Sequence, residues 1–260
     1  MTIKARPLAG SSFGAEILGM DFADRREFPE VERLLVEAGI LLFSGAKIGV
    51  SRHLKLMRHF GPLIRLPHKP SGSGTHPAVM VRSSWKNRDC GGLVFHFDQA
   101  YRPLPCAVSS LYCLAAPKIG GATFFADTHA AYEALPDELK NKLEGKRALN
   151  CCNTPGCRSG ERHRSAHPVF RAHPVTRRRA VYVSRAMTAG IVGLPRAESD
   201  RTLQALFSYQ ELRRSVYIHP WAEGDLILID NRRMIHGRDG VDPRQRRAIR
   251  MVMSAPERPF

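Results

Sequence analysis

The sequence predicts a mainly β fold with some α structure: a double-stranded β-helix (a jelly-roll, cupin-like barrel) with helical decoration. Two observations favour it. Many short apolar runs of strand length alternate with a few helix-length segments, a spacing typical of barrels and sandwiches. The 260 residues also contain no internal repeat and no linker-like segment, and 43% of them are hydrophobic. We therefore expect a single domain over residues 1–260.

The first half of the chain should form an N-terminal α/β elaboration and the first barrel strands. Residues 28–38 carry apolar side chains at helical spacing. Residues 51–60 repeat this pattern, with Ser51 as the expected N-cap. Residues 66–78 are rich in Pro, Gly, Ser and His and should form a loop. The expected strands are residues 15–18, 40–43, 78–81, 93–98 and 108–115.

The second half should complete the barrel. Asp127 or Thr128 is the expected N-cap of the predicted helix at residues 128–135. Residues 150–179 are basic and rich in Cys, His, Pro and Gly, and should be irregular. The expected helices are residues 128–135, 136–143 and 199–212, and the expected strands are residues 122–126, 181–183, 216–219, 226–229 and 248–253.

The composition limits the partners. A net charge of +16 favours anionic partners, namely an acidic substrate, an acidic carrier protein or nucleic acid. Nucleic acid is disfavoured, because the chain has no basic helix, no aromatic RNP-type motif and no zinc-finger spacing. No apolar run is long enough to span a membrane, and residues 1–9 lack a signal core, so we expect a cytoplasmic protein. The sequence is compatible with a homo-oligomer.

Six cysteines stand at positions 90, 106, 113, 151, 152 and 157, without a CxxC pair. We expect reduced thiols, since a chain of this length needs no disulfide framework. Cys151, Cys152, Cys157, His163 and His167 lie close together in the sequence, and thiolates with imidazoles suit Zn²⁺. The segment is therefore either a structural zinc site or a cover over the active site.

Two stretches that lie far apart in the sequence contain residues that can bind one metal together. On a strand, residues i and i+2 project to the same face, so His96 and Asp98 can point into a barrel together. His236 would complete the set from a distant turn. Two imidazoles and one carboxylate form the ligand set of a non-haem Fe(II) oxygenase, with three positions left for co-substrate and O2. His96, Asp98 and His236 are the predicted metal-binding and catalytic residues.

Arg247 and Thr123 could anchor a second ligand beside this metal. A guanidinium binds a carboxylate through two parallel hydrogen bonds, which a lysine cannot reproduce. Arg247 begins the last predicted strand, and Thr123 follows Gly120-Gly121. The Thr123 hydroxyl could donate to the same carboxylate. An ordinary surface role for Arg247 is the alternative, because Arg250 and other arginines lie around it in so basic a chain.

The separated motifs resemble those of the taurine dioxygenase and dichlorophenoxyacetate dioxygenase (TauD/TfdA) family of Fe(II)/2-oxoglutarate enzymes. The resemblance covers nearly the whole chain in the family's order. The matching stretches are FGAEI at 13–17, RHFGP at 58–62, HFD at 96–98, GGATFFAD at 120–127, AAYEAL at 130–135, HPVFRAHP at 167–174, VYVSR at 181–185, and residues 224–247, which contain His236 and Arg247.

The resemblance implies the chemistry. His96, Asp98 and His236 would bind Fe(II), and Thr123 and Arg247 would hold the distal carboxylate of 2-oxoglutarate. The implied reaction uses O2 and converts 2-oxoglutarate to succinate and CO2 while oxidising a small, anionic, carboxylate-bearing substrate. Hydroxylation is the default outcome, and desaturation or oxidative decarboxylation stays open. Related halogenases lack the carboxylate found here at Asp98, which favours oxygen transfer or desaturation.

The chain departs from the family pattern at the expected substrate site. The taurine-type enzyme has a second arginine a few residues after the 2-oxoglutarate arginine, where this chain has Met251, with Arg250 one position earlier. A one-residue shift on a strand turns a side chain to the opposite face, so sulfonate recognition is in doubt. Arg250 stays as an alternative 2-oxoglutarate anchor or a substrate residue, and His68 as a substrate residue.

A non-enzymatic role is the second class of function. A catalytically retired barrel could bind an acidic partner or a polyanion through its basic surface alone. The complete His96, Asp98 and His236 set favours the enzyme, because a purely structural role requires no such set.

Overall fold

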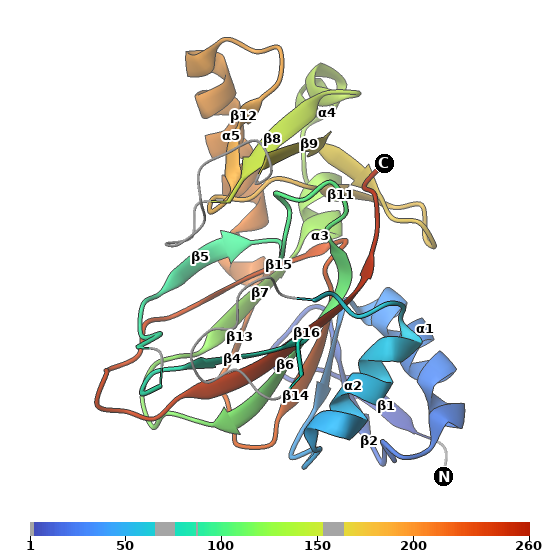
Figure 1. Ribbon diagram of the computed structural model, residues 1–260. Helices are drawn as coiled ribbons and strands as arrows, with labels where there is room; N and C mark the ends of the chain where they lie inside the picture. The colour runs from blue at the N-terminus through green and yellow to red at the C-terminus, as the bar shows by residue number, and fades with distance from the viewer. Residues whose placement is uncertain (1–2, 66–75, 87, 153–163) are drawn as a thin grey trace.

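The computed structural model describes residues 3–65, 76–86, 88–152 and 164–260. Among these residues the largest sheet has seven strands, and its central strands are flanked by neighbours from both halves of the chain (Figure 1). In spatial order, it consists of β1 (Lys4–Pro7), β2 (Ala15–Leu18), β3 (Ile40–Phe43), β14 (Leu226–Asp230), β6 (Cys106–Ala115), β16 (Ala248–Pro256) and β4 (Val79–Ser83).

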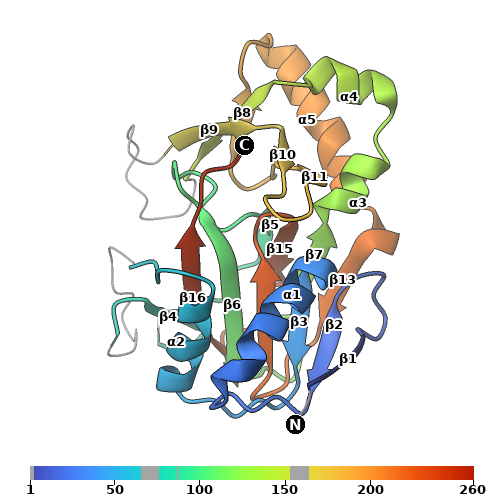
Figure 2. The same cartoon turned by 90° about the vertical axis from the view of Figure 1, so that its right-hand side faces the viewer.

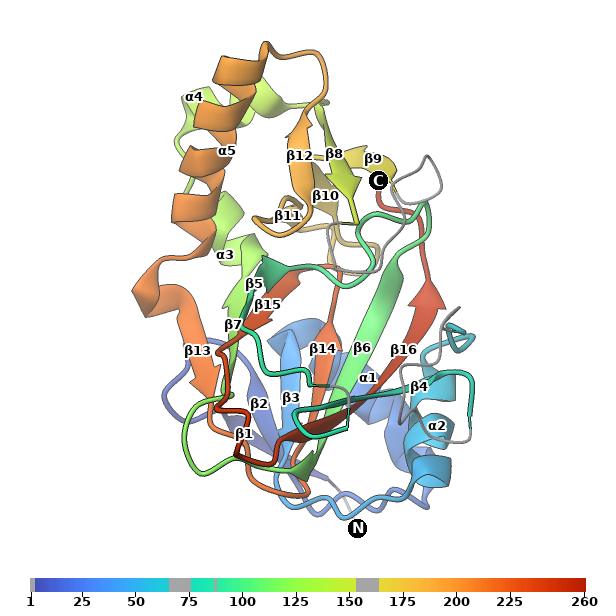
Figure 3. The same ribbon diagram turned by 60° about the vertical axis from the view of Figure 1, so that its left-hand side comes forward.

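A second sheet of four antiparallel strands packs against the first (Figure 3). Its order is β13 (Val216–His219), β7 (Thr123–Asp127), β15 (Met234–Arg238) and β5 (Leu93–His96). Phe125 and Tyr217 of this sheet share one apolar cluster with Ile227, Ile249 and Met251 of the large sheet. Burial of these side chains between the sheets closes the predicted jelly-roll barrel.

Two helices cover the outer face of the large sheet (Figure 2). They are α1 (Phe28–Ala38) and α2 (Val50–His59). Val31 and Leu35 of α1 and Leu54 of α2 are buried against that sheet. The large sheet is therefore apolar on both faces, whereas only one of its faces looks into the barrel.

A smaller layer lies over one end of the barrel (Figures 1 and 2). Its helices are α3 (Thr128–Glu133), α4 (Asp137–Leu143) and α5 (Arg196–Gln210), and its strands are β8 (Arg147–Cys151), β9 (Arg164–Pro168), β10 (Phe170–Ala172), β11 (Arg179–Val181) and β12 (Thr188–Ile191). Leu143, Phe170, Ile191 and Leu206 belong to a separate apolar cluster within this layer. None of the described helices has the length and apolar character of a membrane span.

Several sequence predictions need correction. Helix α2 begins at Val50 with Gly49 as its N-cap and no side-chain cap, so Ser51 lies within the helix. The predicted irregular segment contains β9 and β10 in its described part. Asp127, by contrast, caps α3 as expected, since its side chain accepts a hydrogen bond from the His129 N–H. His68 lies outside the described residues.

Among the described cysteines, one departs from the prediction of reduced thiols. Cys90, Cys106, Cys113 and Cys151 are free thiols. Cys152 is disulfide-bonded, which corrects the expectation of reduced thiols at that position.

Candidate active site

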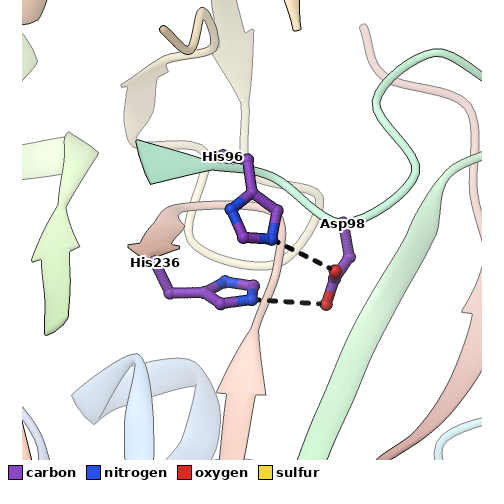
Figure 4. A group of neighbouring side chains, drawn as sticks. All are labelled: His96, Asp98 and His236. Atoms are coloured by element: carbon purple, nitrogen blue, oxygen red, sulfur yellow. Dashed lines mark ion pairs between the residues drawn. The ribbon is translucent and has the colours of Figure 1, made fainter. Parts of the chain in front are cut away.

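The three predicted metal ligands converge between the two sheets (Figure 4). His96 ends β5 and is the direct antiparallel neighbour of His236 in β15. The His96 Nε2 atom lies 3.7 Å from Asp98 Oδ1, and the His236 Nε2 atom lies 3.7 Å from Asp98 Oδ2. All three side chains are buried, so the cluster is enclosed by the barrel wall rather than displayed on the surface.

Asp98 reaches this cluster in a different way from the one predicted. Strand β5 ends at His96, so Asp98 lies in the turn that follows and strand alternation does not place it. Asn231 holds it instead. The Asp98 N–H donates to Asn231 Oδ1 at 2.8 Å, while Asn231 Nδ2 donates to the carbonyl oxygens of Asp98 at 3.0 Å and Cys106 at 2.8 Å. The sequence analysis missed Asn231, although it stands in the stretch that leads to His236.

Both imidazoles are neutral, which is the form that binds a metal, and a hydrogen bond orients the ring of His96. His96 Nδ1–H donates to the Val94 carbonyl oxygen at 3.1 Å, which leaves the Nε2 lone pair free to face Asp98. Burial, followed by the nearby His236, lowers the pKa of His96 to about 3. Burial also lowers the pKa of His236. Both rings are therefore neutral at physiological pH, as metal coordination requires.

The donor set fits a divalent metal ion. The candidate ligand atoms of His96, Asp98 and His236 lie within 4.8 Å of one another. Asp98 Oδ2 is buried and has no hydrogen-bond partner among the described residues. A buried carboxylate oxygen without a partner is costly unless a cation balances it. The residues present therefore match a two-histidine, one-carboxylate metal site.

A cavity of about 250 Å³ opens beside this cluster, and both predicted carboxylate anchors line it. The Arg247 Nε–H donates to the Gly121 carbonyl oxygen at 2.9 Å, which fixes the guanidinium beside the β6–β7 turn. Thr123 Oγ1 accepts a hydrogen bond from Trp221 Nε1 at 2.9 Å, so its own hydroxyl hydrogen is available to a ligand. Arg247 and Thr123 thus line the same cavity as the three candidate metal ligands, and their role as carboxylate anchors stays a prediction.

Arg247 is a buried cation that lines the cavity. Burial lowers its pKa to about 10, and the positive charge of Arg238 contributes. It forms no ion pair among the described residues, and a buried guanidinium that keeps unused donors is suited to a bound carboxylate.

Arg250 lies outside the cavity. Its Nε–H donates to His53 Nδ1 at 3.0 Å, and its Nη2 donates to the Ile48 carbonyl oxygen at 2.8 Å. Its guanidinium also stacks over the Tyr112 ring, 4.3 Å from the centroid. These contacts are on the α2 side of the large sheet. The alternative roles of Arg250 as a 2-oxoglutarate anchor or a substrate residue are therefore not supported by its position.

The sequence analysis missed other cavity residues. Arg82, Gln99 and Arg238 add polar groups to the lining. Strand alternation after His236 could have suggested Arg238, whereas Arg82 carried no signal in so basic a chain. Met251 lines the cavity at the position where the taurine-type enzyme has an arginine. The other apolar lining residues are Met80, Leu93, Leu111, Ala186, Met187, Ile249 and Met253.

The proposed zinc cluster is weakened in its described part. His167 Nε2–H donates to the Arg102 carbonyl oxygen at 2.9 Å, and Cys152 is disulfide-bonded. Cys157 and His163 lie outside the described residues. Within the part of the chain that the structure describes, His96, Asp98 and His236 form the only metal-type cluster of His, Cys, Asp or Glu side chains.

Comparisons with known proteins agree with this geometry. The (S)-phenoxypropionate/alpha-ketoglutarate-dioxygenase of Sphingobium herbicidovorans is 28% identical over 262 residues, which cover 92% of this chain and 90% of that protein. The alpha-ketoglutarate-dependent 2,4-dichlorophenoxyacetate dioxygenase of Cupriavidus pinatubonensis is 29% identical over 279 residues, which cover 96% of each chain.

A solved structure also matches the chain over its whole length. The crystal structure of AAD-2 in complex with Mn(II) and N-oxalylglycine matches with a TM-score of 0.83 and 25% identity, over 100% of this chain and 99% of that one. The family model described as "Taurine catabolism dioxygenase TauD, TfdA family" matches residues 4–253. The chain therefore belongs to the TauD/TfdA family and is a 2-oxoglutarate-dependent dioxygenase.

Proposed function

We propose that the protein is an Fe(II)- and 2-oxoglutarate-dependent oxygenase that uses O2 to oxidise a small molecule bearing an anionic group. The observation that carries the proposal is the convergence of His96, Asp98 and His236 at one end of a cavity that Arg247 and Thr123 also line. A metal site alone would fit many enzymes, whereas a metal site that shares its cavity with a carboxylate anchor fits a dicarboxylate co-substrate.

Arg247 and Thr123 would hold the distal carboxylate of 2-oxoglutarate. The guanidinium of Arg247 offers parallel N–H donors, and the Thr123 hydroxyl adds a third. The relatives' names include alpha-ketoglutarate, and AAD-2 was crystallised with N-oxalylglycine and Mn(II), which supports this assignment. His96, Asp98 and His236 would hold the metal, which would lie at the end of 2-oxoglutarate opposite to that distal carboxylate.

Fe(II) in this site would supply the means to reduce O2 with electrons from 2-oxoglutarate, which leaves as succinate and CO2, while the substrate is oxidised. The protein's contribution is placement and exclusion of water. Apolar side chains such as Met80, Leu111 and Ile249 line the cavity and keep bulk water from the reacting groups. Hydroxylation is the default outcome, while desaturation or oxidative decarboxylation would require a different placement of the substrate.

Succinate production with Fe(II), ascorbate and 2-oxoglutarate tests the proposal. We expect the wild-type protein to release succinate, and the His96→Ala and Asp98→Ala variants to lose roughly a hundredfold or more of this activity, since each removes a ligand. His59→Ala, on the partly exposed face of α2, is the control and should retain activity. Circular dichroism should show that all variants fold. Unchanged turnover in the ligand variants would remove them from the site.

A further inference from the structure

Arg82 and Arg238 are the cavity cations to which the proposed function gives no role. Arg82 is the one at the edge of the sheet. It lies on β4, the edge strand of the large sheet, directly opposite Ile249 of β16. Paired residues on neighbouring strands project to the same face, and Ile249 faces the cavity. Arg82 therefore points toward the metal side of the sheet, opposite to Arg250. Its side chain is 42% exposed, so it stands where the cavity opens to solvent.

Asp89 is shared unequally between Arg82 and Arg238. Arg238 forms an ion pair with Asp89 Oδ1 and also donates to the Asp89 carbonyl oxygen at 3.3 Å. Arg82 reaches only Asp89 Oδ2, at 3.5 Å, which is long for a hydrogen bond. Arg238 thus uses two of its three nitrogens on Asp89, and its third, Nε, is buried without a partner among the described residues. Arg82 has the weaker hold on Asp89 and the more exposed side chain, 42% against 11%, so its donors are the ones that a ligand entering from solvent can reach.

The charges around the cavity do not balance without an anionic substrate. Among the described residues, the guanidinium groups of Arg82, Arg238 and Arg247 have one carboxylate beside them, that of Asp89, while the other cavity carboxylate, Asp98, is assigned to the metal. The distal carboxylate of 2-oxoglutarate would neutralise Arg247. One positive charge is then left, and it is located at Arg82. A substrate with one negative charge would pair with this guanidinium through charge-assisted hydrogen bonds.

We propose that Arg82 binds the anionic group of the substrate and that it replaces, from the opposite strand, the second arginine that this chain lacks at Met251. The substrate class is an apolar molecule with a single carboxylate or similar anion. Its apolar body would lie against Met80, Met187 and Met251, whose flexible thioethers adapt to ring or chain shapes. This inference rests on the proposed function, because it assumes 2-oxoglutarate at Arg247.

Matched acids and amides test the inference by binding. Protein loaded with Mn(II) and N-oxalylglycine is titrated calorimetrically with 2,4-dichlorophenoxyacetate, phenylacetate and the primary amide of each. We expect the wild-type protein to bind the acids more tightly than the amides, and Arg82→Met to lose roughly ten- to hundredfold of that preference, the range for a charge-assisted hydrogen bond. Arg82→Lys should keep part of it, because the charge remains.

Arg246→Met is the matched control. Arg246 is exposed and stacks on the Trp85 ring beside the same strands, but it does not line the cavity. Its loss should leave the acid preference intact, which separates a direct contact from long-range attraction. Equal binding of acids and amides, binding of neither, or an unchanged preference in Arg82→Met would overturn the role of Arg82. Failure to bind Mn(II) and N-oxalylglycine would instead contradict the proposed function and remove the basis of this inference.

Discussion

At the scale of single residues, the site depends on which face of β16 a side chain occupies. Arg247 precedes the strand and lines the cavity, whereas Arg250 contacts His53 and Ile48 on the other side of the sheet. We expect Arg247→Ala to raise the KM for 2-oxoglutarate roughly tenfold or more, because a charge-assisted carboxylate contact is lost.

The Arg250→Ala variant is the complement to that change. It should leave the KM for 2-oxoglutarate unaltered and instead lower the free energy of unfolding by about 1–3 kcal/mol, since His53 Nδ1 and the Ile48 carbonyl oxygen lose their donor. Steady-state kinetics and urea denaturation measure the two effects. A larger KM change in Arg250→Ala than in Arg247→Ala would reassign the anchor.

Asn231 should control metal binding without touching the metal. Its amide fixes the backbone of Asp98 on both sides, so Asn231→Leu frees the turn that carries the carboxylate ligand. We expect the Mn(II) affinity to fall by roughly ten- to a hundredfold, the usual cost of losing a residue that orients a metal ligand. Isothermal titration with Mn(II) measures it.

Asn150→Leu is the control for that prediction. Asn150 is also buried and also loses amide hydrogen bonds, to the Ala148 carbonyl oxygen and the Thr188 hydroxyl, but it lies in β8, away from the metal ligands. It should destabilise the fold while leaving the Mn(II) affinity of the folded protein unchanged. An equal loss of affinity in both variants would show that Asn231 acts through general stability.

The residues of the site were predictable to different degrees. His96, Asp98, His236, Thr123 and Arg247 stand out because their chemistry and order are informative. The orientation of Arg250 was not predictable, because β16 is buried on both faces and alternation alone does not reveal which face is the interior. The roles of Arg82 and Asn231 depend on contacts between strands far apart in the sequence.

At the scale of elements, the β6–β7 turn positions Arg247, the proposed co-substrate anchor. A Cβ at Gly121 would lie 2.8 Å from Arg247 Cδ, and Gly121 has a φ of +69°. Gly121→Ala should therefore displace Arg247 and raise the KM for 2-oxoglutarate severalfold. Gly145 has the same φ of +69° and nothing within 4 Å, which makes Gly145→Ala a matched control.

Both alanine variants should lose about 1–2 kcal/mol of stability from the left-handed backbone conformation. Only Gly121→Ala should change the KM. Thermal unfolding and kinetics on the two variants give the comparison, and identical KM values would show that the turn has no part in holding Arg247.

Elements with a strong apolar pattern were predicted well. The strands at residues 15–18, 40–43 and 216–219 and the helix at residues 28–38 are confirmed with the expected bounds. Strand β1 was missed because its sequence, KARP, is exposed throughout and carries no apolar alternation. Strand β15 was missed because polar residues of the preceding turn obscure its start, although it holds His236.

At the scale of the whole molecule, burial of neutral histidines makes stability depend on pH. Burial, followed by the charge of Arg250, lowers the pKa of His53 to about 3. The unfolded chain binds a proton at this residue below about pH 6.5, whereas the folded protein does not until about pH 3. The contribution of such a histidine to the free energy of unfolding is therefore fully present above pH 6.5. It falls as the pH drops, by about 1.4 kcal/mol per pH unit for each such histidine.

His53→Gln should remove one histidine's share of this dependence. Glutamine can accept from Arg250 and donate to Ser110, as His53 does, but it does not titrate. Urea denaturation at several values between pH 6 and 4 should show a slope shallower than that of the wild type by about 1.4 kcal/mol per pH unit. Equal slopes would mean that His53 is not buried as a neutral ring. His129, whose pKa burial also lowers to about 3, should account for another share.

The overall arrangement explains why the site needs nearly the whole chain. Strand β5 from the first half and β15 from the second half are neighbours in one sheet, and the facing sheet contributes Arg82 and the strand β16 that Arg247 precedes. The organisation of residues 1–260 as a single domain stays a prediction. The sequence motifs indicated this assembly, but the closure of two sheets around a common cavity is a three-dimensional property.

The most direct test is a crystal structure of the protein grown with Mn(II) and N-oxalylglycine, with anomalous data collected at the manganese edge. We predict one anomalous peak bonded to His96 Nε2, Asp98 and His236 Nε2, and an inhibitor carboxylate against Arg247 and Thr123. A metal located elsewhere, or bound without the Asp98 carboxylate, would contradict the account.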